Sequence, residues 1–116
     1  MPKYVDEKGK TTWTYVVYAI QLDKDACANP KSPCKGTSCG STPVYVGQTA
    51  ITANERFEQH KAGYRASRWV RRHGLYLRRQ LARGFGELAT KDQALAAEAA
   101  LGERLRRRGY CVYGAH

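Results

Sequence analysis

The segment that begins at Thr90 constrains the fold most, because it predicts a long helix with one apolar side. Thr90 and Gln93 form a capping box at its start, and Gly109 follows its expected end near Arg108. A helix of this length must bury its apolar side against another element. The chain therefore needs a second layer of structure for this helix to cover.

An acid interrupts the apolar side of this predicted helix. On a helical wheel Ala94, Leu101 and Leu105 form one stripe, and Glu98 lies within it. Glu103 falls on the opposite, solvated face. A carboxylate that faces a core is costly unless a cation or hydrogen bonds receive it. Glu98 is therefore interpreted as either a metal ligand or one half of a buried ion pair.

Shorter patterns in the rest of the chain predict a small α+β domain. β-Branched and aromatic runs indicate strands, and a second capping box at Thr52 and Glu55 opens a helix that Gly63 ends. The expected elements are strands over 13–22 and 44–47, helices over 53–62 and 66–73, a strand over 75–81 (or a continued helix), the long helix, and a short strand over 110–113. We expect a central antiparallel three-stranded sheet flanked by helices, in the order β-β-α-α-β-α before that last strand.

The chain is expected to form one domain over residues 13–116. The polar residues 1–12 are interpreted as a frayed tail and not as a signal peptide, which favours a cytoplasmic location. Residues 23–43, rich in cysteine, proline and glycine, are interpreted as a long insertion at the tip of a hairpin between the first two strands. No apolar run is long enough to span a bilayer, so no membrane partner is expected.

A formal net charge of +10 on 116 residues indicates a polyanionic partner. Between positions 56 and 86 nine residues are basic and only Glu58 is acidic, and aromatic residues are interleaved among the basic ones. A ribosome-like or merely cationic surface is the alternative interpretation. The residues expected to contact a nucleic-acid backbone are Lys61, Arg65, Arg68, Arg71 and Arg72.

The four cysteines match no standard zinc pattern. Cys27, Cys34 and Cys39 are spaced seven and five residues apart, and Cys111 lies near the C-terminus. Reduced thiols that bind no metal are the expectation for a cytoplasmic protein. A zinc site at Cys27, Cys34 and Cys39, completed by Cys111 or a histidine, is the alternative.

Four segments together resemble the GIY-YIG nuclease superfamily. Val16-Val17-Tyr18 and Tyr45-Val46-Gly47 take the places of its two signature tripeptides, with Gly47 expected to free the backbone for a tight turn. The stretch from Asn54 to His60 resembles the arginine helix, and that from Ala94 to Glu98 the metal-binding segment. The resemblance covers roughly residues 15–113. The chain departs from the family pattern in Val16, in the long hairpin insertion and in Cys111, where many members have asparagine.

This resemblance implies a metal-dependent endonuclease that hydrolyses phosphodiester bonds, with DNA favoured over RNA. Glu98 would be the protein ligand of one Mg²⁺ or Mn²⁺ ion, and Arg56 would hold the phosphate. Tyr18 would orient or deprotonate the attacking water, and the second role needs a nearby cation to lower its pKa. Tyr45 and His60 would complete the network.

Two other functions fit the same sequence. One is a non-catalytic basic module that binds nucleic acid on the same fold, and the other is a zinc-stabilised interaction protein. A chain this short has little room for a separate specificity domain. Specificity would therefore need a partner protein, a homodimer or recognition of the structure of the nucleic acid.

Overall fold

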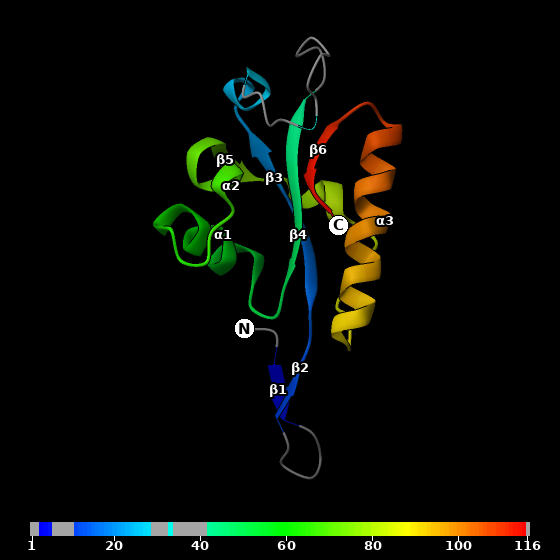
Figure 1. The fold of residues 1–116 in the computed structure, drawn as a ribbon. Helices are drawn as coiled ribbons and strands as arrows, with labels where there is room; N and C mark the ends of the chain where they lie inside the picture. The colour runs from blue at the N-terminus through cyan, green and yellow to red at the C-terminus, as the bar shows by residue number, and fades with distance from the viewer. Residues whose placement is uncertain (1–2, 6–10, 29–32, 34–41, 116) are drawn as a thin grey trace.

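A four-stranded sheet with the order β5-β3-β4-β6 carries the fold (Figure 1). The computed structural model describes residues 3–5, 11–28, 33 and 42–115. The strands of this sheet are β3 (Val16–Leu22), β4 (Pro43–Thr49), β5 (Gly74–Leu77) and β6 (Cys111–Gly114). Strand β3 is antiparallel to β4 and β5, whereas β6 is parallel to β4. The predicted α+β class is confirmed.

The prediction of three antiparallel strands is wrong, because the last strand joins the sheet beside β4. Helix α3 (Lys91–Arg107) runs along one face of the sheet before β6 begins. Gly109, with φ of 90°, turns the chain back, and Cys111 then pairs with Pro43 at the start of β4. A crossover through a helix returns a strand in the parallel direction, which a hairpin cannot do.

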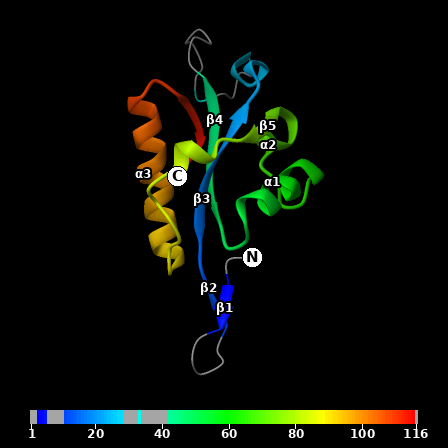
Figure 2. The ribbon, with the colours of Figure 1, turned by 180° about the vertical axis from the view of Figure 1, so that it is seen from behind.

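Helices cover both faces of the sheet (Figures 1 and 2). Helices α1 (Ala53–Ala62) and α2 (Arg68–His73) lie on one side, and α3 lies on the other. The capping residues act as predicted: Thr52 accepts a hydrogen bond from the Glu55 amide, and Thr90 from the Gln93 amide. Two 3₁₀ turns, η1 (Lys24–Ala28) and η2 (Arg79–Ala82), complete the described helices.

The core has two parts, one on each face of the sheet. Val17, Ala19, Val44 and Val46 pack with α3 residues, including Leu101 and Leu105. Tyr18, Ile20 and Leu22 pack on the other face with Val70 and Tyr113. Alternate residues of β3 thus enter different cores, as the two-residue period of a strand requires.

Several segments differ from the sequence-based expectations. Within the segment interpreted as a frayed tail, β1 (Lys3–Val5) pairs antiparallel with β2 (Thr11–Trp13), and residues 1–2 and 6–10 lie outside the described residues. The strand expected over 75–81 ends at Leu77 and gives way to η2. Most of the insertion 23–43 lies outside the described residues.

None of the helices described is long and apolar enough to cross a membrane.

Candidate active site

The register of β3 and β4 places Tyr18 directly opposite Gly47. A Cβ atom on Gly47 would lie 2.6 Å from the Tyr18 hydroxyl oxygen and 3.2 Å from Cε1 of Tyr45. The Tyr18 hydroxyl end therefore occupies the space that a side chain at position 47 would fill. The expectation of a tight turn at Gly47 is wrong, because β4 continues to Thr49. The glycine is needed for this close approach.

His60 joins the two tyrosines from helix α1. Its side chain is buried at 1% exposure, and its Nε2 lies 3.0 Å from the Tyr18 hydroxyl oxygen. The His60 ring lies edge-on to Tyr45, with 5.6 Å between their centroids, and the two tyrosine rings are 6.4 Å apart. Three polar rings from three elements thus form one cluster.

Ser67, just before α2, is a member of this cluster that the sequence interpretation missed. Its backbone N–H donates to Nδ1 of His60 at 2.9 Å. Its side chain lowers the pKa of Tyr45, against the larger rise caused by burial. A serine before an arginine-rich helix is a typical N-cap, but the helix was expected to begin at Ala66, which hid that signal.

Arg56 lies one turn before His60 on α1, and its guanidinium holds the turn that follows the helix. Nη1 donates to Oε1 of Gln59 at 2.9 Å and to the Tyr64 carbonyl at 3.3 Å, and Nη2 donates to the Arg65 carbonyl at 2.8 Å. Arg65 has a left-handed φ of 43°. Arg56 therefore fixes an otherwise unfavourable turn and stays beside the ring cluster.

Glu98 approaches the two tyrosines from the opposite side of the sheet. It is buried at 6% exposure on the inner side of α3, as the helical wheel predicts, whereas Glu103 is exposed and bonds Arg107 at 3.2 Å. The Glu98 charge contributes to the raised pKa of both Tyr18 and Tyr45. The structure therefore brings Tyr45, Arg56, His60 and Glu98 within interaction range of Tyr18, and the catalytic role of these five residues stays a prediction.

Burial determines how this cluster ionises. It raises the pKa of Tyr18 well above its usual 10, and the Arg56 charge offsets only part of that rise. Burial, and then the Arg56 charge, lowers the pKa of His60 to about 4. Arg56 thus lowers the pKa of Tyr18, as a nearby cation should, but burial and the charge of Tyr45 raise it by more, and His60 is neutral near pH 7 and adds no positive charge.

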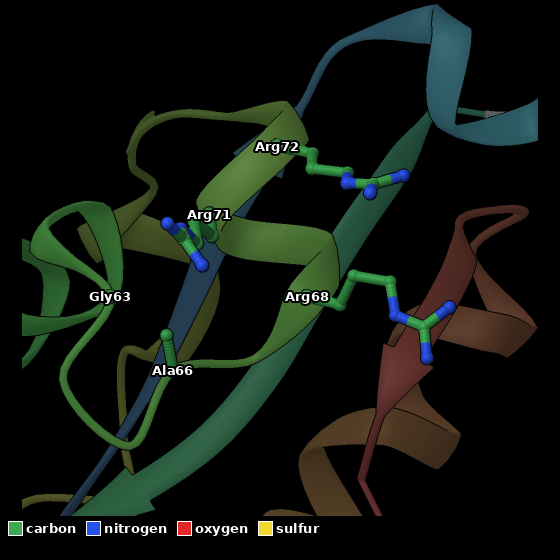
Figure 3. A pocket seen from close by; sticks show the side chains of 5 residues that line it. All are labelled: Gly63, Ala66, Arg68, Arg71 and Arg72. Carbon is green, nitrogen blue, oxygen red and sulfur yellow. The ribbon is translucent and has the colours of Figure 1, made fainter.

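The predicted nucleic-acid contacts fall into two groups. Arg68, Arg71 and Arg72 are exposed and, with Gly63 and Ala66, line an open cavity of about 620 Å³ (Figure 3). Figure 3 shows Arg68 and Arg72 extending to the same side of α2, with Arg71 on the other side near Gly63. No ion pair joins these three arginines to an acid in the part of the chain that is described.

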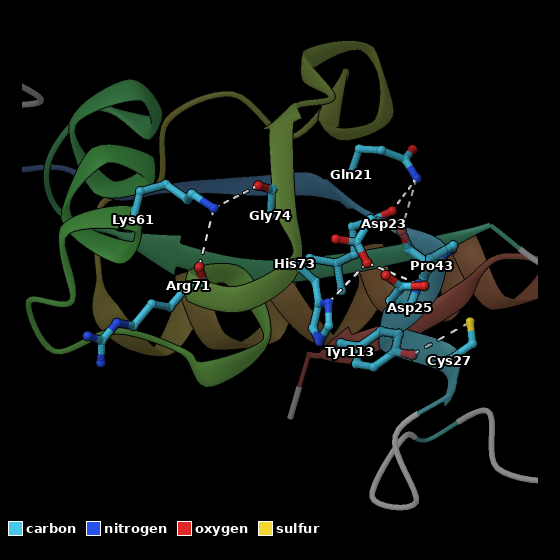
Figure 4. Close-up of polar contacts among 11 residues, drawn as sticks. Gln21, Asp23, Asp25, Cys27, Pro43, Lys61, Arg71, His73, Gly74 and Tyr113 are labelled. Carbon is cyan, nitrogen blue, oxygen red and sulfur yellow. Dashed lines mark hydrogen bonds and ion pairs between the residues drawn. The ribbon is translucent and has the colours of Figure 1, made fainter.

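Lys61 and Arg65 are already engaged within the protein. Lys61 Nζ donates to the carbonyls of Arg71 at 3.3 Å and Gly74 at 3.0 Å, where α2 ends (Figure 4). The Arg65 guanidinium lies 5.7 Å from the centroid of the Tyr64 ring. Lys61 thus stabilises the end of α2, and its role in binding stays a prediction.

The cysteines differ from the expectation of reduced thiols. Cys111, at the start of β6, is disulfide-bonded, and its amide donates to the Thr42 carbonyl beside the insertion. Cys27 is free, and the Tyr113 hydroxyl lies 3.9 Å from its Sγ (Figure 4). Cys34 and Cys39 lie outside the described residues, so the zinc alternative stays a prediction.

Side chains that could bind a metal are dispersed over the described part of the chain. No three His, Cys, Asp or Glu residues of the described ranges gather into a group that could hold an ion.

Comparisons with the models of known protein families, with curated proteins and with solved structures found no significant match to this chain.

Proposed function

We propose that this protein is a metal-dependent endonuclease that hydrolyses phosphodiester bonds in nucleic acid, with DNA as the favoured substrate. The single observation that carries the proposal is one cluster in which His60 is hydrogen-bonded to Tyr18 and packs edge-on against Tyr45, with the charges of Arg56 and Glu98 acting on both tyrosines. These residues come from four separate elements. Their convergence agrees with the roles that the resemblance to GIY-YIG nucleases implies.

Glu98 is the residue that would hold a Mg²⁺ or Mn²⁺ ion. Mg²⁺ commonly binds one or two carboxylates and completes its octahedron with water and substrate phosphate, so one buried carboxylate fits it. Such an ion, when bound, supplies Lewis-acid stabilisation of the charge on the phosphate and leaving oxygens. Glu98 is 6% exposed, and its charge acts on both Tyr18 and Tyr45.

Arg56 is suited to bind the scissile phosphate. Its three bonds to Gln59, Tyr64 and Arg65 hold the guanidinium in place. A guanidinium has five N–H donors, so donors remain for the Tyr18 hydroxyl and for a phosphate oxygen. A guanidinium that is held in place and always charged can stabilise the additional negative charge of a phosphoryl transition state.

Tyr18 would orient the attacking water through its hydroxyl group and keep its own proton near pH 7. Its raised pKa makes the phenolate scarce at that pH, so orientation is the role that its environment favours. Tyr45 and His60 hold the ring of Tyr18 in place from two sides.

The cavity beside α2 would receive the flanking nucleic-acid backbone. Its three arginines carry positive charge with no acidic partner in the described chain. A non-catalytic module that binds nucleic acid through this surface is the competing function.

The deciding experiment is nicking of supercoiled plasmid with Mg²⁺ or Mn²⁺. We expect the wild-type protein to nick DNA and Glu98→Ala to lose this activity. Glu103→Ala removes an exposed acid from the same helix and should retain it. Equal nicking by wild type and Glu98→Ala would refute the site. Tight, salt-sensitive DNA binding with no nicking by the wild type would favour the binding module.

A further inference from the structure

The hydrogen bond from Ser67 determines where His60 carries its proton. A backbone N–H can only donate, so Nδ1 of His60, 2.9 Å away, must accept and carry no hydrogen. A neutral imidazole has one N–H, which is then on Nε2. This assignment follows from the chemistry of the donor and from the positions of the heavy atoms.

The proton on Nε2 determines the direction of the next hydrogen bond. Nε2 lies 3.0 Å from the Tyr18 hydroxyl oxygen, so His60 donates and Tyr18 accepts. The Tyr18 proton is then not used by His60 and can be donated to another group. With the opposite tautomer, Tyr18 would have to donate its proton to His60 to keep the bond.

We infer that Ser67 is a positioning residue whose backbone N–H keeps the proton of His60 on Nε2 and thereby leaves the Tyr18 hydroxyl free to donate toward the substrate. The role of Tyr18 toward substrate rests on the proposed function, whereas the tautomer does not. Ser67 acts through His60 and need not touch a reacting atom.

A pair of substitutions separates the backbone N–H of Ser67 from its side chain. Ser67→Pro removes both, and the φ of −66° at this position suits proline. Ser67→Ala removes only the hydroxyl and keeps the N–H. The Ser67 side chain makes no capping bond to α2, so neither change removes a helix cap.

The first measurement is the tautomer of His60 by ¹⁵N NMR of its ring nitrogens. We expect Nε2 to be protonated in the wild type and in Ser67→Ala, and we expect protonation to move at least partly to Nδ1 in Ser67→Pro. A proton on Nδ1 in the wild type, or the same tautomer in Ser67→Pro as in Ser67→Ala, would overturn the inference. The wild-type and alanine spectra decide the tautomer even if the proline variant does not fold.

The second measurement is plasmid nicking by the same two variants. Ser67→Pro should be slower than Ser67→Ala by about 10- to 100-fold, the size of effect seen when a metal-bound histidine loses the hydrogen-bond partner that orients it. Equal rates would refute the positioning role. A wild type that never nicks would refute the proposed function instead, while the NMR result would still decide the tautomer.

Discussion

The Tyr18 hydroxyl and Nε2 of His60 lie 3.0 Å apart, although 42 residues separate them in the chain. Strand β3 supplies one partner and helix α1 the other, and both side chains are almost fully buried. This bond connects the sheet to the helix that also holds Arg56. Loss of this hydrogen bond should therefore lower both the unfolding free energy of the protein and its proposed nicking activity.

Replacing Tyr18 by phenylalanine should weaken both properties. Removal of the hydroxyl leaves the buried His60 N–H without its partner, which costs about 1–3 kcal/mol of unfolding free energy. Nicking should fall as well, since the group proposed to orient water is lost. Denaturant unfolding and plasmid nicking measure the two effects. Tyr76→Phe is the matched control, because Tyr76 is 53% exposed and its loss should change stability by less than about 0.5 kcal/mol.

The low pKa of His60 should make stability depend on pH. The unfolded chain binds a proton with a pKa near 6.5 and the folded chain with a pKa of about 4, so acid favours unfolding between these values. The unfolding free energy should be highest above pH 6.5 and fall by roughly 3 kcal/mol through this range on account of His60 alone.

His60→Gln isolates this contribution from the titration of carboxylates. Urea unfolding of wild type and variant at several pH values between these limits gives the difference in stability. That difference should shrink as the pH falls. Parallel curves for the two proteins would mean that His60 does not titrate as described.

Gly47→Ala should displace Tyr18. The new Cβ would lie 2.6 Å from the Tyr18 hydroxyl oxygen and 2.7 Å from Cζ, so the ring must move from His60. Overpacking of this kind costs about 1–3 kcal/mol. We expect a lower unfolding free energy and loss of nicking.

A double variant tests whether this clash is the cause. Tyr18→Leu removes the ring, so adding Gly47→Ala to it should cause little further loss of stability. If Gly47→Ala is equally harmful with and without the ring, the glycine is required for another reason. Both comparisons form a double-mutant cycle.

Simultaneous replacement of Arg68, Arg71 and Arg72 by alanine should weaken binding to DNA of any sequence. The slope of log K against log salt concentration should become shallower by about 0.9 for each phosphate that the variant no longer neutralises. Fluorescence anisotropy at several salt concentrations measures this. The matched control removes the same charge from the C-terminal end of α3 and the residue after it, at Arg106, Arg107 and Arg108. An unchanged slope in the first variant would reject the cavity as the binding surface.

Local patterns in the sequence were sufficient to predict helices α1 and α3 and the burial of Glu98, but not the start of α2 or the 3₁₀ turn η2. Helix α1 begins after Thr52 and ends before Gly63 as predicted, because caps act on the nearest backbone groups. Glu98 faces the core because helical periodicity depends only on neighbouring residues. The resemblance to a known family singled out the five residues that the fold then brings together, and their catalytic role stays a prediction.

Pairing between distant segments was decided by the tertiary structure alone. The parallel placement of β6 beside β4 depends on the path of α3 across the sheet, which no local pattern encodes. The role of Gly47 depends on which residue faces it across the sheet, and that of Ser67 on the turn that brings its amide to His60. The sequence by itself determined helices α1 and α3 and which residues of α3 face the core, because caps and helical periodicity depend only on nearby residues. The tertiary structure decided which side chains meet, because strand register sets the distances between residues that are far apart in the chain. It also decided the pKa values, because burial depends on the packing of distant segments and has no local signal in the sequence.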